Sequence, residues 1–197
     1  MEIQKQIHGQ QRPPEVFYLC FTTDINPQAT EAVIAAMSNI VEQGAKKIVI
    51  LLSSPGGSVM SGLTLYDFIR SLPIPVETHN MANVDSIANM VFQAGSRRTC
   101  SKHSTFMFHG VGLASNGVHR WELKALKESM QSIERDQDRI GAILLDRTKL
   151  SKDRVSQLFL EASTEDANFA IEHGIIDEII DIKIPDGAPI ISMVFNR

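Results

Sequence analysis

The sequence predicts an α/β domain built around a parallel β-sheet. Short apolar runs that are rich in β-branched or aromatic residues alternate with segments of helical spacing. The run from Lys46 to Leu52 is apolar almost throughout, as in strands that are buried on both faces of a parallel sheet. No low-complexity linker and no solenoid-type repeat interrupts this alternation.

The first elements follow the alternation closely. Residues 16–21 (VFYLCF) form an aromatic and apolar run that predicts a strand, and turn-forming residues follow at 22–27. Apolar residues three or four positions apart predict a helix over 29–43, closed by Gly44. After the strand at 46–52, the same spacing predicts a helix over 59–71, and prolines stop it.

The middle of the chain contains shorter elements. We expect a strand at 76–79, a short apolar helix at 86–94 that ends at Gly95, and strands at 98–100 and 105–108. Each of the last two strands is bounded by turn-forming or polar residues. This succession favours parallel βαβ units.

One long amphipathic helix is expected from Val118 to about Arg147. The segment has no proline and one glycine, and its apolar residues recur at mostly helical spacing. At 1.5 Å per residue it spans about 40 Å. A helix of that length cannot lie wholly on a 197-residue globule, so we expect it to project and its apolar stripe to meet a partner chain. The remaining elements are helices at 151–160 and 165–173 and strands at 175–184 and 190–195.

Composition excludes several classes of function. The net charge of −4 provides no basic face for nucleic acid. No stretch approaches the roughly 18 apolar residues of a membrane span, and the first residues lack the apolar region of a secretory signal. We expect Cys20 and Cys100 to be buried thiols in a reducing cytoplasm rather than a disulfide. No cysteine–histidine cluster indicates a metal, and no cofactor is expected.

Three features stand where α/β sheets place their sites, on loops after strands. Gly56 and Gly57 would let a ligand approach the backbone closely, so that their amides could bind a negative oxygen. Alternatively, they simply form a tight turn from strand to helix. Ser86 lies at the start of a short helix, where it is either a nucleophile or part of an N-cap that Asp85 or Ser86 itself provides. His109 ends an apolar strand, as a general base or as a hydrogen-bonded histidine of the core rim. Together they are the parts of acyl-transfer catalysis.

Those motifs, in this order, resemble the ClpP family, the proteolytic subunits of Clp-type proteases. Residues 53–69 (SSPGGSVMSGLTLYDFI) resemble the family's SPGG loop and the helix after it, and 172–177 (EHGIID) resemble its EYGLVD segment. Residues 81–88 (MANVDSIA) resemble the nucleophile motif, with Ser86 as the serine, and 106–110 (FMFHG) resemble the motif of the base, with His109 as the histidine. The helix from Val118 resembles the family's handle helix, and the similarity covers roughly residues 16–180.

The resemblance implies a spiral of ββα units and a serine endopeptidase that hydrolyses unfolded proteins inside a chamber. It implies heptameric rings that stack through the handle helices into a tetradecamer, and a separate AAA+ unfoldase. By analogy, the backbone amides of Gly57 and Ile87 form the oxyanion hole. The carboxylate that orients His109 is expected after the handle helix, where Glu161 is the first candidate.

Several alternatives stay open at this point. Asp166 is the second candidate for the carboxylate, although it fits the start of a helix, and Asp136 fits a solvated position on the long helix. A catalytically silent ring subunit and a crotonase-like acyl-CoA enzyme are the alternatives to a peptidase. We expect one ClpP-like domain over 16–197, preceded by a segment at 1–15 that forms an axial loop or is disordered.

Overall fold

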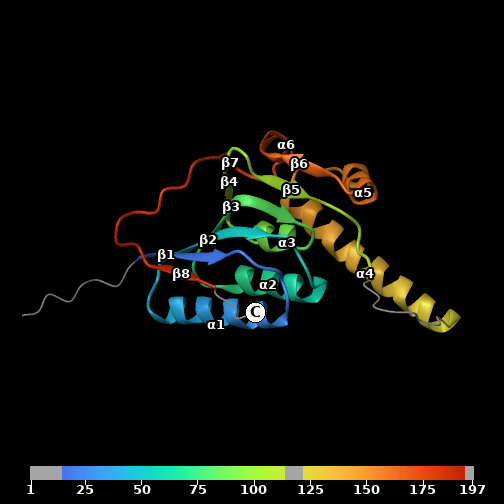
Figure 1. Ribbon diagram of the computed structural model, residues 1–197, viewed down its shortest axis with the longest axis horizontal. Coiled ribbons are helices and arrows are strands. Elements are labelled where there is room, and N and C mark those ends of the chain that lie inside the picture. Colours follow the sequence, from blue (N-terminus) through green and yellow to red (C-terminus); the bar gives the residue numbers. More distant parts are fainter. Residues whose placement is uncertain (1–14, 114–121, 194–197) are drawn as a thin grey trace, which may run out of the picture.

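A computed structural model describes residues 15–113 and 122–193, and its sheet contains eight strands (Figure 1). The strands are β1 (Val16–Phe21), β2 (Lys47–Ser54), β3 (Val76–Asp85), β4 (Arg97–Cys100), β5 (Thr105–Met107), β6 (Thr164–Asp166), β7 (Glu178–Ile179) and β8 (Ile190–Ser192). The helices are α1 (Pro27–Glu42), α2 (Val59–Ser71), α3 (Ala88–Gln93), α4 (Leu123–Arg147), α5 (Lys152–Glu161) and α6 (Ala167–Glu172). The predicted α/β class is confirmed.

Strand β3 organises the sheet around the loops of interest. The main strand order is β6-β5-β3-β2-β1-β8, and β4 joins both β3 and β7. All pairs are parallel except β5 with β6. The first half of β3 pairs with β4 and its last residues pair with β5, so that Asp85 and Met107 are register partners. The backbone just before Ser86 therefore lies beside the strand that leads to His109.

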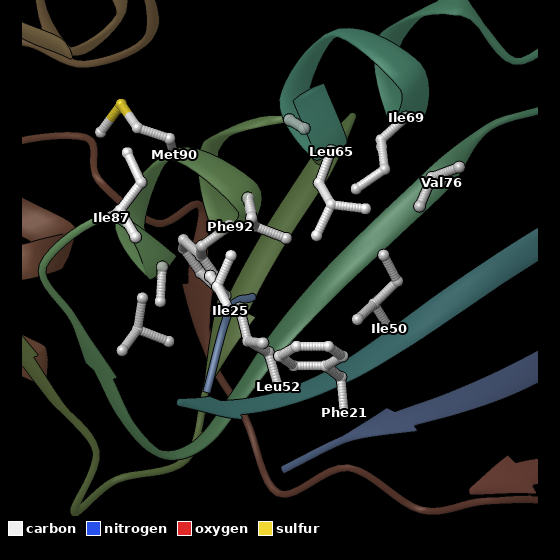
Figure 2. Close-up of a cluster of buried hydrophobic side chains, with 14 of the residues drawn as sticks. Phe21, Ile25, Ile50, Leu52, Leu65, Ile69, Val76, Ile87, Met90 and Phe92 are labelled. Carbon is white, nitrogen blue, oxygen red and sulfur yellow. The ribbon is translucent and has the colours of Figure 1, made fainter. Parts of the chain in front are cut away.

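The main hydrophobic core fills one side of the sheet. Helices α1 and α2 lie along that side (Figure 1), and α3 packs on the end of β3. Figure 2 shows how strand residues such as Phe21 and Leu52 meet Leu65 of α2 and Phe92 of α3. The other face carries a smaller cluster of Tyr18, Val49 and Leu51, which the C-terminal segment covers. This double burial explains why residues 48–52 of β2 are all apolar.

Helix α4 is anchored at its C-terminal end only. Ile140 and Leu144 are buried, and Arg147 donates hydrogen bonds to the carbonyl oxygens of Gln93 (3.0 Å) and Gly95 (2.8 Å). Its N-terminal half leaves the body of the molecule (Figure 1), which confirms the expected projection. The helix begins at Leu123, later than expected, because Glu122 is extended, and residues 118–121 lie outside the described part.

Several predicted boundaries were wrong. Strand β3 runs to Asp85 instead of ending at His79, because its second half finds a partner in β5. The predicted helix at 165–173 begins at Ala167, since residues 164–166 pair with β5 as β6. The predicted strand at 175–184 is reduced to β7, because only Glu178 and Ile179 meet β4. The predicted strand at 190–195 is β8 over its described part, and residues 194–195 lie outside it.

The remaining observations concern the helices, the cysteines and the N-terminal residues. Within residues 15–113 and 122–193, no helix is both long and apolar enough to cross a membrane. Cys20 and Cys100 are both free thiols, as expected, but only Cys100 is buried, and Cys20 is half-buried. Burial raises the pKa of the Cys100 thiol to about 11, which keeps it protonated at neutral pH. Residues 1–14, nearly all of the expected N-terminal segment, lie outside the described residues.

Candidate active site

Ser86 occupies a strained turn between β3 and α3. Its φ angle is +55°, a left-handed conformation that non-glycine residues seldom adopt and that persists only where the surroundings hold it. The strand before it is anchored by fully buried Val84, and the Ser86 amide donates to the carbonyl oxygen of Met107 at 2.8 Å. The turn therefore presents a half-buried hydroxyl at the end of the sheet.

The diglycine turn after β2 lies directly against Ser86. Gly56 has a φ of +93°, and a Cβ at this position would lie 2.7 Å from the Ser86 Cβ and 2.8 Å from the Asp85 carbonyl oxygen. Only glycine allows this approach. The turn is held by the buried Ser54 hydroxyl, which accepts from the Gly56 amide at 3.2 Å and donates to the Thr23 carbonyl at 2.7 Å.

Two backbone amides beside this contact have no partner in the described part of the chain. Ile87 precedes the first turn of α3, and its amide donates to no described acceptor. The Gly57 amide is likewise without a described acceptor, because the bridge to Ile25 uses the Gly56 carbonyl and the Ser58 amide instead. Such orphan N–H groups can stabilise a negative oxygen.

His109 follows β5 on an extension that is hydrogen-bonded to the last turn of α5 and to the residues just after it. The Phe108 amide donates to the Ser163 carbonyl at 2.8 Å, and the Gly110 amide donates to the Phe159 carbonyl at 3.1 Å. The exposed His109 ring places Nδ1 2.7 Å from the Gly110 carbonyl oxygen. Because a carbonyl only accepts, Nδ1 carries the proton and Nε2 of the neutral ring keeps its lone pair. That is the tautomer of a general base.

Ser86 and His109 line one cavity of about 90 Å³, which we call the site cavity. The cavity also reaches Gly57 and Ile87, so it contains every group of the expected site except the carboxylate. Its remaining walls are largely apolar and include Val59, Met90, Phe108, Val111, Ile140, Leu144 and Phe159. No hydrogen bond joins the Ser86 hydroxyl to the His109 ring in the described structure, so the two groups are neighbours that are not yet aligned.

The three acidic candidates occupy different environments. Glu161 ends α5, where its carboxylate accepts from Gln157 Nε2 at 2.8 Å and from the Ser163 hydroxyl at 3.4 Å. Asp166 caps α6 by accepting from the Phe169 amide at 2.8 Å, as its sequence position suggested. Asp136 on α4 pairs with Arg139 at 3.3 Å. Among the described residues, none of these carboxylates bonds to His109.

The Asp85 carboxylate lies on the face of β3 opposite to Val84. Alternate residues of a strand point to opposite faces, so Asp85 shares a face with Asn83 and not with buried Val84. Its carboxylate accepts from Asn83 Nδ2 at 2.6 Å. The carboxylate next to Ser86 is thus tied to Asn83, on the face of β3 opposite to buried Val84.

Sequence reasoning missed Asn89 in this region. Its side chain is completely buried, lines the site cavity and contacts the Ser86 turn. The available signal was an amide within the short, largely apolar helix ANMVFQ. Within the described ranges, no group of three or more histidine, cysteine or acidic residues is placed to hold a metal ion.

Comparisons with known proteins agree with one another. A family model described as "Clp protease" matches residues 11–183. A protein of Gloeobacter violaceus named ATP-dependent Clp protease proteolytic subunit 1 is 29% identical over 166 residues, covering 80% of this chain and 79% of its own. Two further relatives are each named ATP-dependent Clp protease proteolytic subunit. The protein of Chlorella vulgaris is 28% identical over 172 residues, which cover 85% of this chain and 83% of the relative. The protein of Oltmannsiellopsis viridis is 26% identical over 167 residues, which cover 83% of each chain.

Proposed function

The chain belongs to the Clp protease family, and from that premise we propose that it is a serine-type peptidase with Ser86 as nucleophile and His109 as general base. The observation that carries the proposal is the site cavity, which gathers Ser86, His109 and the Gly57 and Ile87 amides. The family is one of peptidases, so the reaction class follows from membership, whereas the assignment of these residues is ours.

The proposed reaction uses each of these groups in turn. The Ser86 Oγ attacks the carbonyl carbon of a peptide bond, and its proton passes to Nε2 of His109. The carbonyl oxygen becomes an oxyanion, which the Gly57 and Ile87 amides stabilise. Collapse of this intermediate breaks the C–N bond, and the amine leaves with the proton from His109. Water then hydrolyses the acyl-enzyme by the same steps.

We assign Glu161 as the carboxylate that orients His109. Its support is the backbone pairing of residues 159–163 with residues 108–110, which keeps Glu161 on the segment next to His109. For this role the ring must release the Gly110 carbonyl, and Glu161 must release Gln157 or Ser163. A catalytically silent ring subunit is the competing function, and the absence of an aligned Ser86–His109 pair in the described structure favours it.

The family's proteolytic subunits generally form oligomeric rings and work with ATPase partners. We propose that this chain forms heptameric rings, which stack in pairs through α4 into a tetradecamer, and that an AAA+ unfoldase delivers unfolded proteins to it. The exposed apolar side chains of α4 support the stacking. The two free thiols support a reducing, cytoplasmic location. The acyl-CoA alternative has no support from the comparisons.

Covalent labelling of the assembled protein by a fluorophosphonate tests the assignment. We expect one label per subunit on Ser86, with none in Ser86→Ala and normal labelling in Ser71→Ala, which changes an exposed serine far from the site. His109→Gln is expected to slow labelling by about 10²–10⁴-fold, and Glu161→Gln by a similar factor at most. The exposed His103 provides the matched His103→Gln control. An assembled ring that takes up no label would establish the silent subunit instead.

A further inference from the structure

We propose that Asn89 is a positioning residue for the nucleophile: its side-chain amide ties the left-handed turn at Ser86 to strand β5, which leads to His109. The inference rests on the proposed roles of Ser86 and His109 and adds a residue to the same site. Asn89 acts through the backbone of its neighbours and is not assigned contact with the reacting atoms.

The contacts of the Asn89 amide are all with backbone carbonyl groups. Its Nδ2 lies 2.9 Å from the Met107 oxygen, 3.1 Å from the Ser86 oxygen and 3.2 Å from the Val84 oxygen. Three acceptors around one end of the side chain fix its orientation, with the NH₂ group toward the carbonyls. Two hydrogens are shared among three oxygens, so the amide holds the residues before, at and across from the turn together.

These bonds reinforce a conformation that the turn alone does not favour. A φ of +55° at Ser86 persists only where its surroundings overdetermine it. The Met107 oxygen already accepts from the Ser86 amide at 2.8 Å, and the Ser86 oxygen accepts from the Asn89 amide at 3.1 Å. The Asn89 side chain adds a second bond to each of these oxygens. Because Met107 stands two positions before His109, this doubled link sets the position of the nucleophile against the base.

The burial of Asn89 shows that packing alone would favour another residue. Its side chain is completely buried on a largely apolar helix, and its Oδ1 has no partner in the described structure. An unpaired buried oxygen is unfavourable, whereas an apolar side chain of similar size would have left no unpaired oxygen. The amide is thus a poor choice for stability and a good one for holding three carbonyl groups in place.

The test compares Asn89→Ala and Asn89→Leu with Gln93→Ala. Gln93 is an equally buried amide of the same helix, but it bonds to the Ile175 carbonyl at 3.1 Å and to Arg98, away from the site cavity. For each assembled variant we would measure the rate constant of Ser86 labelling by a fluorophosphonate, kcat and KM for a peptide, and the unfolding temperature.

Both Asn89 variants are expected to label about 10- to 100-fold more slowly, because small displacements of reacting groups have effects of that size. The loss should fall on kcat rather than KM, and Asn89→Leu should keep the unfolding temperature near that of the wild type. Gln93→Ala is expected to unfold at a lower temperature and to label at the wild-type rate. Hydrogen exchange at the Ser86 amide should be faster in both Asn89 variants and unchanged in Gln93→Ala.

Three results would overturn the inference in distinguishable ways. Wild-type labelling rates in the Asn89 variants would remove the positioning role and leave Ser86 as nucleophile. A change confined to KM would make Asn89 a wall of the binding cavity instead. A wild-type protein that takes up no label at all would remove the proposed function together with this inference.

Discussion

The backbone of Gly56 lies so close to Ser86 that no side chain fits between them. A Cβ there would lie 2.7 Å from the Ser86 Cβ, and the φ of +93° adds strain for any L side chain. We expect Gly56→Ala to push the Ser86 turn away from the Gly57 amide. Labelling of Ser86 should slow by about 100-fold, since a displacement of about 1 Å has an effect of that order.

Gly44→Ala is the control for this substitution. Gly44 has a similar φ of +84°, but a Cβ there would meet nothing within 4 Å. It should lower the free energy of unfolding by about 1–2 kcal/mol through backbone strain alone and leave the labelling rate unchanged. Equal labelling rates in Gly56→Ala and Gly44→Ala would mean that the close approach has no role in the site.

Individual functional residues could be predicted from the sequence only where a motif contains them. Ser86 could be singled out because it begins a short apolar helix, and His109 because it ends an apolar strand. Asn89 and Ser54 could not, because their roles depend on contacts with Met107 and Thr23, which lie far from them in the chain. The carboxylate proposed to orient His109 is the hardest case, since α5 and its following turn are placed by backbone pairing that no local pattern encodes.

Among the elements, β3 shows most clearly where local patterns fail. The first half of this strand could be predicted from residues 76–79, but the second half, MANVD at 81–85, lacks strand propensity and is extended because β5 pairs with it. By contrast, the bounds of α2 were predicted correctly, since apolar spacing and two following prolines are local signals. The extension matters for function, because it brings the residue before Ser86 beside Met107.

Strands β3 and β4 are also joined by a buried polar group. His79 and Thr99 are register partners, and His79 Nδ1 lies 2.8 Å from the Thr99 hydroxyl while Nε2 lies 3.2 Å from the Ser101 hydroxyl. Burial lowers the pKa of His79, and the charge of Arg97 lowers it further against the opposing effect of Asp181. The folded protein thus disfavours a proton that the unfolded chain accepts near pH 6.5.

The pH dependence of stability follows from this difference. Above about pH 6.5, His79 is neutral in both states, and its contribution to stability is fully present. As the pH falls through 6.5 toward the lower pKa of the folded state, the unfolded chain binds the proton first and stability is lost. We expect the urea midpoint of the wild type to fall more between pH 7.5 and pH 5.5, about one unit either side of the ordinary histidine pKa, than that of His79→Gln.

The exposed His103 is the matched control for that measurement. His103→Gln removes an exposed histidine, so the urea midpoint of this variant should show the same pH dependence as that of the wild type. If His79→Gln did so as well, the strand-joining histidine would not be the group that titrates.

On the scale of the whole molecule, the N-terminal half of α4 projects from a packed body, and we call this half the arm. The C-terminal part of the helix is fixed by Ile140, Leu144 and Arg147, so the arm emerges in a defined direction (Figure 1). The arm continues the same helix whose C-terminal part supplies Ile140 and Leu144 to the wall of the site cavity. The proposed contact between the arms of two subunits would therefore act on a helix that also borders the proposed catalytic groups.

The exposed apolar residues of this arm make the stacking of rings testable. Leu123, Leu126 and Met130 are 69%, 42% and 60% exposed, and their spacing places them along one side of the helix. Burying a leucine or methionine contributes about 1.5–3 kcal/mol, so an arm-to-arm contact would bury enough apolar surface to hold two rings together. We expect Leu126→Glu combined with Met130→Glu to separate stacked rings into single rings or smaller species in sedimentation velocity.

Gln131→Glu introduces one negative charge, against two in the double variant, at a neighbouring polar position of α4, and it should leave the sedimenting mass of the wild type unchanged. Because both apolar side chains are exposed and far from the buried anchor of α4, the double variant should also keep the far-ultraviolet circular dichroism of the wild type. An unchanged mass in the double variant would show that the apolar side of the arm is not the surface that joins the rings. A lower mass with loss of Ser86 labelling would show that assembly through α4 also aligns Ser86 with His109, two groups that are neighbours without a hydrogen bond in the single chain.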